Sequence, residues 1–252
     1  MTRIIDLSVS IDNDAGETAP PQIKYIDHEQ GAEEAAQWFN LKKEDFPEQK
    51  AWAQEYVNLT THTGTHLDAP YHFGPLSEGK PAKTIDQVPL EWCFSDGVVL
   101  DFSFKAAGDV ITEDDIKNEL IRIDYKIKPM DIVMIRTDAD KNFYQKNYSS
   151  SHAGMSAEAT RYLIGLGVKV MGIDGWGWDV PFVIQAENYK KEKRDDILWA
   201  AHFVGKEMEY CHIEKLANLD KLPPFGFKVA VFPVKIKGAS AGWARPVAIF
   251  EE

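Results

Sequence analysis

Short runs of apolar and β-branched residues recur along the chain, and polar or glycine-containing segments separate them. Runs of this kind, bounded by turn-forming residues, predict β-strands. We therefore expect strands at residues 3–9, 55–61, 97–102, 131–137, 168–174, 227–236 and 246–250.

Helix-forming segments lie between several of these runs. "TEDDIKNELIRI" begins with Thr112 and an acidic first turn, whereas "SAEATRYLIGLG" begins with Ser156 and stops at Gly167. Thr and Ser are good N-caps, acidic side chains stabilise a first turn, and glycine favours a helix end. A third helix is expected from about Asp195 to about Glu207. Interleaved strands and helices predict a mixed α/β fold, and because no linker divides residues 1–252 we expect one domain.

Residues 12–52 do not follow this pattern. They contain "ETAPPQ", the acidic "EQGAEEAAQ" and the aromatic side chains Trp38, Phe39 and Trp52. Long functional loops and surface elaborations look alike in a sequence. Two interpretations therefore stay open: a lid, or a surface elaboration with one short helix.

Composition narrows the class of protein. Hydrophobic residues make up 44% of the 252 residues, which is enough for a buried core, and the net charge of -12 disfavours binding to nucleic acid or to an anionic membrane. No apolar run predicts a signal peptide or a membrane span, so a cytoplasmic location is expected by default. Cys93 and Cys211 belong to no CxxC pair, and we expect both to be reduced packing residues.

The densest chemistry lies in "HTGTHLDAPYH", residues 62–72, which holds three of the 7 histidines. His62, His66, Asp68 and His72 share parity, but in a straight strand His62 and His66 would be about 13 Å apart. Ligands of one metal ion lie much closer together, so the chain must curl. Gly64 is the natural bend, because glycine adopts conformations that other residues avoid.

Two imidazoles and a carboxylate can form a catalytic metal site that leaves a position open for water. The pKa of water on such an ion can fall from 15.7 to roughly 7, which provides a nucleophile near neutral pH. His72, beyond Pro70, is then suited to accept and return a proton. The alternative, a surface loop with histidines by chance, explains one histidine better than it explains the whole constellation.

The same stretch resembles the HxGTHxDxPxH signature of the metal-dependent cyclase family, which includes bacterial kynurenine formamidase and isatin hydrolase. The resemblance implies that His62, His66 and Asp68 bind a metal and that His72 is the acid/base residue. It also implies the family's β-rich swivelling fold, with a curled mixed sheet and peripheral helices, and assembly into a homodimer or homotetramer. Residues 12–52 and 176–196 depart from the compact formamidases and are expected to be variable elaborations.

Formamidase members carry a second metal held by a histidine and by a glutamate twelve residues later. In "AAHFVGKEMEYCHIEKLANL", His202 and Glu214 match this spacing. On one helix, twelve residues would span about 18 Å, so the helix must end near Glu207 and the chain must return as strand or loop. His212, which would point the same way as Glu214 on a strand, is a rival ligand to His202.

The resemblance implies a metal-dependent hydrolase that cleaves the C–N bond of an amide or cyclic amide in a small aromatic or carboxylated molecule, in the manner of an arylformamidase or isatin hydrolase. One or two ions per subunit, zinc or manganese, would suit the ligand set. A lactone hydrolase and a ring-forming cyclase are alternatives. A metal-loaded ligand-binding protein that has lost turnover is the non-enzymatic alternative.

Two further aromatic residues are candidates for the substrate pocket. Trp176 and Trp178 follow a predicted strand, where a strand-end loop can line a pocket, although ordinary core packing is an equal alternative. The "KGASAGW" segment before Trp243 is interpreted as a turn near the site or as a plain hairpin. His152, ahead of a helix, is interpreted as a loop histidine.

Overall fold

The computed structural model describes residues 2–251. A nine-stranded mixed sheet forms its centre, in the order β1-β15-β13-β7-β9-β11-β12-β4-β14. The strands are β1 (Arg3–Asp6), β4 (His66–Asp68), β7 (Phe94–Asp101), β9 (Ile132–Arg136), β11 (Val170–Ile173), β12 (Cys211–Glu214), β13 (Phe227–Ala230), β14 (Ala241–Trp243) and β15 (Val247–Phe250). From β7 to β12 the neighbours are parallel, and the outer strands are antiparallel.

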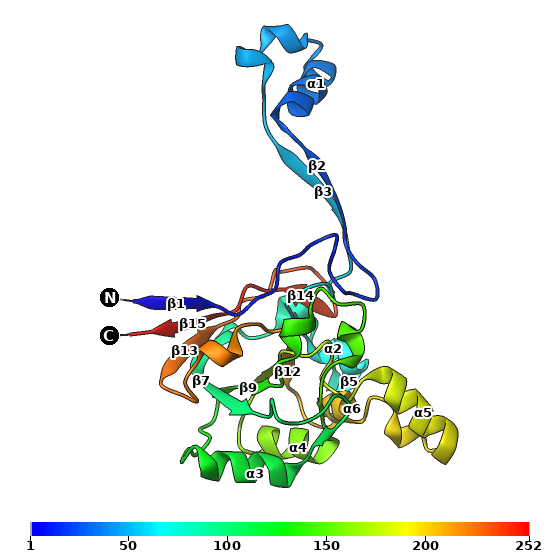
Figure 1. Cartoon of the computed structure of the whole chain (residues 1–252), viewed down its shortest axis with the longest axis vertical. Coiled ribbons are helices and arrows are strands. Elements are labelled where there is room, and N and C mark those ends of the chain that lie inside the picture. The colour runs from blue at the N-terminus through cyan, green and yellow to red at the C-terminus, as the bar shows by residue number, and fades with distance from the viewer. Residues whose placement is uncertain (1, 252) are drawn as a thin grey trace.

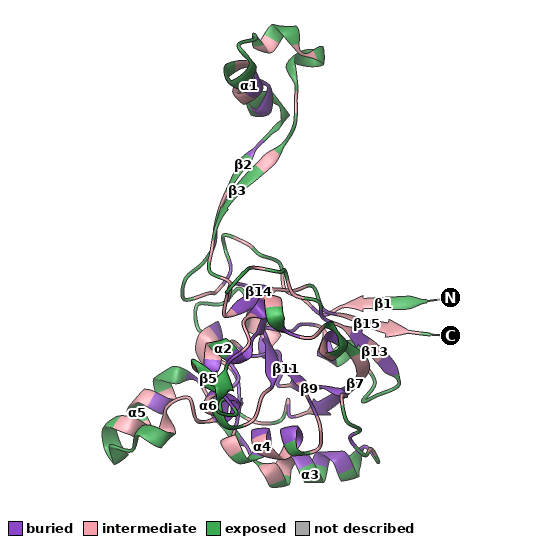
Figure 2. Cartoon of the chain, turned by 180° about the vertical axis from the view of Figure 1, so that it is seen from behind, coloured by how far each residue is buried: buried purple, intermediate pink, exposed green. Residues whose placement is uncertain are grey.

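Both faces of the central strands are buried, as expected for parallel strands. Val98 and Leu100 of β7 face one hydrophobic cluster, and Val99 faces the other. The first cluster lies under α3 (Glu113–Arg122) and α4 (Ala157–Gly165), whose N-caps are Thr112 and Ser156 as predicted (Figures 1 and 2). The second hydrophobic cluster, which includes Val99, Met134 and Ile213, lies on the opposite face of the sheet.

The body of the protein contains three further helices, α2 (Pro70–Phe73), α5 (Phe182–Glu192) and α6 (Ala200–Glu207). It also contains two small strand pairs, β5 (Leu76–Ser77) with β6 (Lys80–Pro81) and β8 (Val110–Ile111) with β10 (Gly154–Met155). The described residues also include eight short 3-10 helices: Lys43–Asp45, Pro47–Gln49, Ile85–Gln87, Leu90–Cys93, Ala139–Asn142, Tyr148–Ser150, Asp195–Ile197 and Leu219–Lys221. Among residues 2–251, no helix combines the length and apolar character needed to cross a membrane.

An arm projects from this body (Figure 1). It consists of the antiparallel pair β2 (Gln22–Ile26) and β3 (Gln54–Asn58), with α1 (His28–Phe39) at its far end. The strand expected at 55–61 is therefore real but belongs to the arm, not to the central sheet. The short helix expected within 12–52 is α1.

The structure confirms the mixed α/β prediction, shifts the start of one predicted helix and adds one helix that was not predicted. The third helix begins at Ala200 instead of Asp195, because Trp199 has a left-handed φ of 56° that separates α6 from the turn Asp195–Ile197. Helix α5 was not predicted. Its sequence lacks a strong apolar periodicity, and in the structure Gln185 is its only buried residue.

Candidate metal centre

The histidine-rich stretch curls at Gly64, as its spacing predicted. Gly64 has φ 63°, a conformation that glycine adopts without steric cost, and its carbonyl accepts a hydrogen bond of 2.8 Å from His66 Nδ1. Its N–H donates to Glu17, which also binds the buried Lys215 Nζ at 2.7 Å. The curl brings His62 Nδ1 to 3.3 Å from His66 Nε2.

Strand pairing supplies most of the remaining site. In the antiparallel register of β12 with β4, Glu214 lies opposite His66 and His212 lies opposite Asp68. Directly opposed residues in such a pair project on the same side of the sheet, so all four side chains meet. Helix α6 ends at Glu207 and the chain returns as β12, which confirms the chain path inferred from the spacing between His202 and Glu214.

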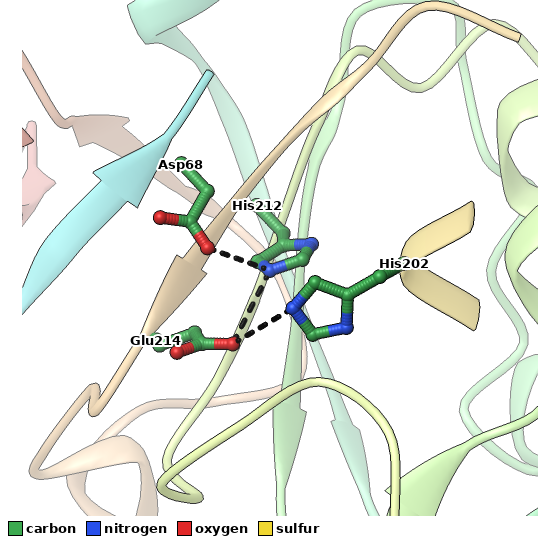
Figure 3. A group of neighbouring side chains, drawn as sticks. All are labelled: Asp68, His202, His212 and Glu214. Atoms are coloured by element: carbon green, nitrogen blue, oxygen red, sulfur yellow. Dashed lines mark ion pairs between the residues drawn. The ribbon is translucent and has the colours of Figure 1, made fainter. Parts of the chain in front are cut away.

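Two carboxylates stand at the middle of the cluster. Asp68 Oδ1 lies 2.9 Å from His62 Nδ1 and 3.3 Å from His66 Nε2, whereas Oδ2 lies 3.1 Å from His212 Nε2. Glu214 Oε2 lies 3.6 Å from His66 Nε2. Its Oε1 lies 3.5 Å from His202 Nε2 and 3.3 Å from His212 Nε2 (Figure 3). Each carboxylate thus presents one oxygen to each of two groups of histidines.

Each of these four histidines has its other ring nitrogen held. His62 Nε2 contacts Ser240 Oγ at 3.0 Å, His66 Nδ1 donates to Gly64, His212 Nδ1 donates to Tyr210 Oη, and His202 Nδ1 donates to Asp179. A partner on one ring nitrogen fixes the ring orientation and leaves the lone pair of the other directed at the cluster, as in protein metal sites.

The electrostatics also suit a cation. Burial favours the neutral form of Asp68 and Glu214, but neighbouring histidines outweigh burial and hold the pKa of both carboxyls well below the ordinary range. Both are therefore ionised, although Asp68 is fully buried. Within residues 2–251, neither Asp68 oxygen has a conventional hydrogen-bond partner. Buried anions require compensating positive charge, which protonated imidazoles or a metal ion can provide.

His72 lies at the edge of the cluster. Its Nε2 is 3.8 Å from Asp68 Oδ2, and its side chain is 20% exposed. Burial, with the nearby His62 and His202, lowers the pKa of His72 to about 4, so its ring is neutral near pH 7 and can accept a proton. The ring of Trp199 lies 5.3 Å from that of His72 and stacks on His202 at 4.8 Å.

A cavity of about 180 Å³ opens onto the cluster, and Trp176 is one of its lining residues. Trp178 differs from the expectation that it lines the pocket. Its indole is 0% exposed, stacks on His212 at 5.3 Å and donates to Thr160 Oγ1, so it supports the site from below. No residue of 12–52 lines this cavity. The arm formed by β2, β3 and α1 projects outward from the body of the protein (Figure 1).

Sequence analysis did not identify the roles of several residues at the site. His212 was treated as an alternative to His202, yet the structure brings both to Glu214. Asp179 was not singled out, and its only signal was its position after the Trp176–Trp178 loop. Ser240, which contacts His62, lies in "KGASAGW", so this segment is a turn at the site. His152 was interpreted as a loop histidine, but its side chain lines the cavity.

Comparison with known proteins places this geometry in a family. The family model described as "Putative cyclase" matches residues 5–180. The chain belongs to the cyclase family. The match includes the whole histidine-rich stretch and the Trp176–Asp179 loop, whereas His202, His212 and Glu214 lie beyond it.

Individual relatives are distant. An isatin hydrolase of Roseibium aggregatum is 26% identical over 216 residues, covering 79% of this chain and 75% of the relative. Among solved cyclase-family structures, isatin hydrolase A from Ralstonia solanacearum matches with a TM-score of 0.78 at 23% identity, covering 99% of this chain and 92% of that one. A structure described as a potential metal-dependent hydrolase with cyclase activity gives 0.65 at 19% identity, covering 100% of both chains. These likenesses support the fold.

Proposed function

We propose that this cyclase-family protein is a metal-dependent hydrolase that opens a C–N bond in an amide or cyclic amide of a small aromatic or carboxylated molecule. The observation that carries the proposal is the paired carboxylates, Asp68 and Glu214, surrounded by imidazole nitrogens at the foot of a cavity. The isatin hydrolase relative supports the reaction class.

The donor set fits a borderline divalent ion such as zinc or manganese, because imidazole nitrogens and carboxylate oxygens are suitable ligands for both. The proposed ligands are His62, His66, Asp68, His202, His212 and Glu214, whose imidazole nitrogens surround the two buried carboxylates. Asp68 and Glu214 each face two groups of histidines, so the ligand set could hold one or two ions.

A bound ion would supply an activated water and an electrophile for the scissile carbonyl. The protein's own groups perform the remaining tasks. His72 Nε2, neutral and oriented toward the carboxylates, would take a proton from the attacking water and deliver it to the departing nitrogen. Trp199 would cover His202 and exclude water from that side.

Metal removal tests this proposal. The purified protein should contain one or two equivalents of zinc or manganese per chain by elemental analysis. Treatment with a chelator should abolish hydrolysis of isatin, N-formylkynurenine or related amides, and restored metal should recover it. His72→Asn should lower kcat by about a hundredfold or more while the metal content stays unchanged. Activity that is indifferent to chelation would refute the mechanism.

Assays that add simple lactones and linear acids to these amide substrates separate the alternative functions. Preference for simple lactones over every amide would indicate a lactone hydrolase, and ring closure from a linear acid would indicate a cyclase. A metal-loaded binding protein would bind ligands without turnover, and His72→Asn would then have no catalytic consequence. The position of His72 Nε2, 3.8 Å from Asp68 Oδ2, favours the hydrolase, because binding alone needs no group that transfers protons.

A further inference from the structure

Two residues that line the cavity each carry a buried polar atom without a hydrogen-bond partner among residues 2–251. These atoms are His152 Nε2 and Trp176 Nε1, and the cavity opens onto the metal centre. A buried polar atom without a partner is costly, so such atoms in a pocket mark positions where a ligand completes the bonding.

His152 presents an acceptor. Its Nδ1 donates to the Ala153 carbonyl at 3.1 Å, so in the neutral ring Nε2 carries the lone pair. The side chain is 1% exposed and packs against the backbone of Gly175, where a Cβ would lie only 2.8 Å from the ring. Burial lowers the pKa of His152, which supports the neutral ring. The imidazole is thus fixed in place and offers an acceptor only.

Trp176 presents a donor. An indole Nε1–H cannot accept a hydrogen bond, so this group requires an oxygen or nitrogen lone pair from a ligand. The ring packs against the small cluster that contains Phe143 and Tyr148. Its position is further fixed by Lys215, whose Nζ lies 5.6 Å from the ring centroid.

Much of the remaining wall is apolar or aromatic. Val180, Pro181, Phe182 and Trp199 contribute to it, and the volume of about 180 Å³ suits one small ring system. The cavity therefore combines a largely apolar wall with one fixed acceptor and one fixed donor.

We propose that His152 and Trp176 form a recognition subsite that selects N–H-bearing substrates, such as secondary amides and lactams, over the isosteric esters and lactones. The substrate N–H would donate to His152 Nε2, and a substrate oxygen would accept from Trp176 Nε1. This inference rests on the proposed function, because it assigns the substrate class of the same site.

The selectivity has a simple physical origin. An oxygen in place of the N–H would put its lone pair against the lone pair of His152 Nε2, and both would remain buried and unpaired. A site built around a hydrogen bond rejects an analogue that lacks the donor much more strongly than an apolar pocket rejects a change in size. We expect about a ten- to hundredfold difference in affinity.

A pair of ligands that cannot be hydrolysed tests the subsite without turnover. Indole-2-carboxylate and benzofuran-2-carboxylate have the same shape and differ by N–H against ring oxygen. Calorimetric titration of the metal-loaded full-length protein should show the indole binding about ten- to hundredfold more tightly. Equal affinity for the two, or no binding of either, would overturn the proposal.

Variants assign the preference to its residues. His152→Phe should erase the preference, and His152→Gln, which retains an acceptor oxygen, should restore part of it. Trp176→Phe should weaken both ligands by a similar factor. His28→Phe and Trp52→Phe, on the arm, are matched controls and should change neither affinity. A preference that survives His152→Phe, or loss of a metal equivalent in that variant, would contradict the assignment.

The binding result is separable from hydrolysis. If the indole preference is present and depends on His152, but no amide is turned over, then the subsite stands and only the proposed hydrolase activity fails. If amides are hydrolysed but the two ligands bind equally, the reverse conclusion holds.

Discussion

At the scale of single residues, the orientation of His202 depends on Asp179. The carboxylate accepts hydrogen bonds from His202 Nδ1 and from the backbone N–H groups of Ala201 and His202. Asp179→Asn would leave at least one of these donors poorly matched and remove the negative charge beside the ring. We expect a ten- to hundredfold loss of metal affinity, roughly the usual effect of such partners.

A competition titration against a chromophoric chelator would measure this affinity. Asp195→Asn, at an exposed position, is the matched control and should behave as the unchanged protein. If Asp179→Asn binds metal as tightly as the unchanged protein, then His202 does not rely on Asp179 or is not a ligand.

His212 provides a second prediction at this scale. Its Nε2 faces Asp68 Oδ2 and Glu214 Oε1, on the side away from His62. In a two-ion site, His212→Phe should lower the metal content from two equivalents toward one, because the group of His62 and His66 remains intact. Elemental analysis after desalting would count the ions, with His28→Phe as control. Unchanged stoichiometry would exclude His212 as a ligand.

The sequence placed the local part of this site, and the family resemblance added His202 and Glu214, but other contributions from distant segments were missed. His62, His66, Asp68 and His72 lie in one short stretch, so parity and spacing sufficed to place them together and to require the bend at Gly64. Ser240, Asp179 and His152 approach from distant segments. Their roles depend on strand register and loop path, such as the pairing of β4 with both β12 and β14, which no short pattern encodes.

At the scale of elements, the loop after β11 carries much of the pocket and is fastened by Asp174. Both of its carboxylate oxygens accept from Thr137 N at 2.9 Å, Oδ1 also accepts from Thr137 Oγ1, and Oδ2 accepts from Asp138 N at 2.8 Å. Asp174→Asn would turn an amide N–H₂ toward these donors. We expect the free energy of unfolding to fall by about 1–3 kcal/mol.

Urea denaturation would measure that loss, with Asp195→Asn as control. Because the Trp176–Asp179 loop follows Asp174 directly, metal affinity should also fall. Stability equal to that of the unchanged protein would show that the interaction of Asp174 with Thr137 and Asp138 does not hold the loop.

Six of the nine strands in the described central sheet and the two capped helices were predictable because their signals are local. Val98 to Leu100 and Ile132 to Ile135 are continuous apolar runs, as buried parallel strands require, and Thr112 and Ser156 are direct cap signals. The start of α6 and the existence of α5 were not predictable, whereas the end of α6 at Glu207 was predicted. The left-handed conformation of Trp199, whose N–H donates to Gln185, is imposed by tertiary contacts.

At the scale of the whole molecule, the arm is the feature that a single chain does not explain. Its far end exposes Trp38 by 59% and Phe39 by 64%, with Leu41 beside them, while Ala32 and Ala35 of α1 are buried within the arm itself. Large apolar side chains gathered on a projecting element mark a contact surface. We expect this surface to meet a second copy of the chain, in keeping with the homo-oligomer implied by the sequence resemblance.

Deletion of the arm tests this assembly without disturbing the body. Gln22 and Asn58 are directly paired at the base of β2 and β3, so a short glycine linker can join Pro21 to Leu59. The shortened chain should fold, because the central sheet and both of its hydrophobic clusters lie outside the deleted segment. Light scattering should show a monomer where the full chain gives a dimer or tetramer, and Phe39→Glu should shift the same equilibrium with the fold intact. A full-length monomer, or an armless protein of unchanged assembly, would assign the exposed aromatic surface to another partner.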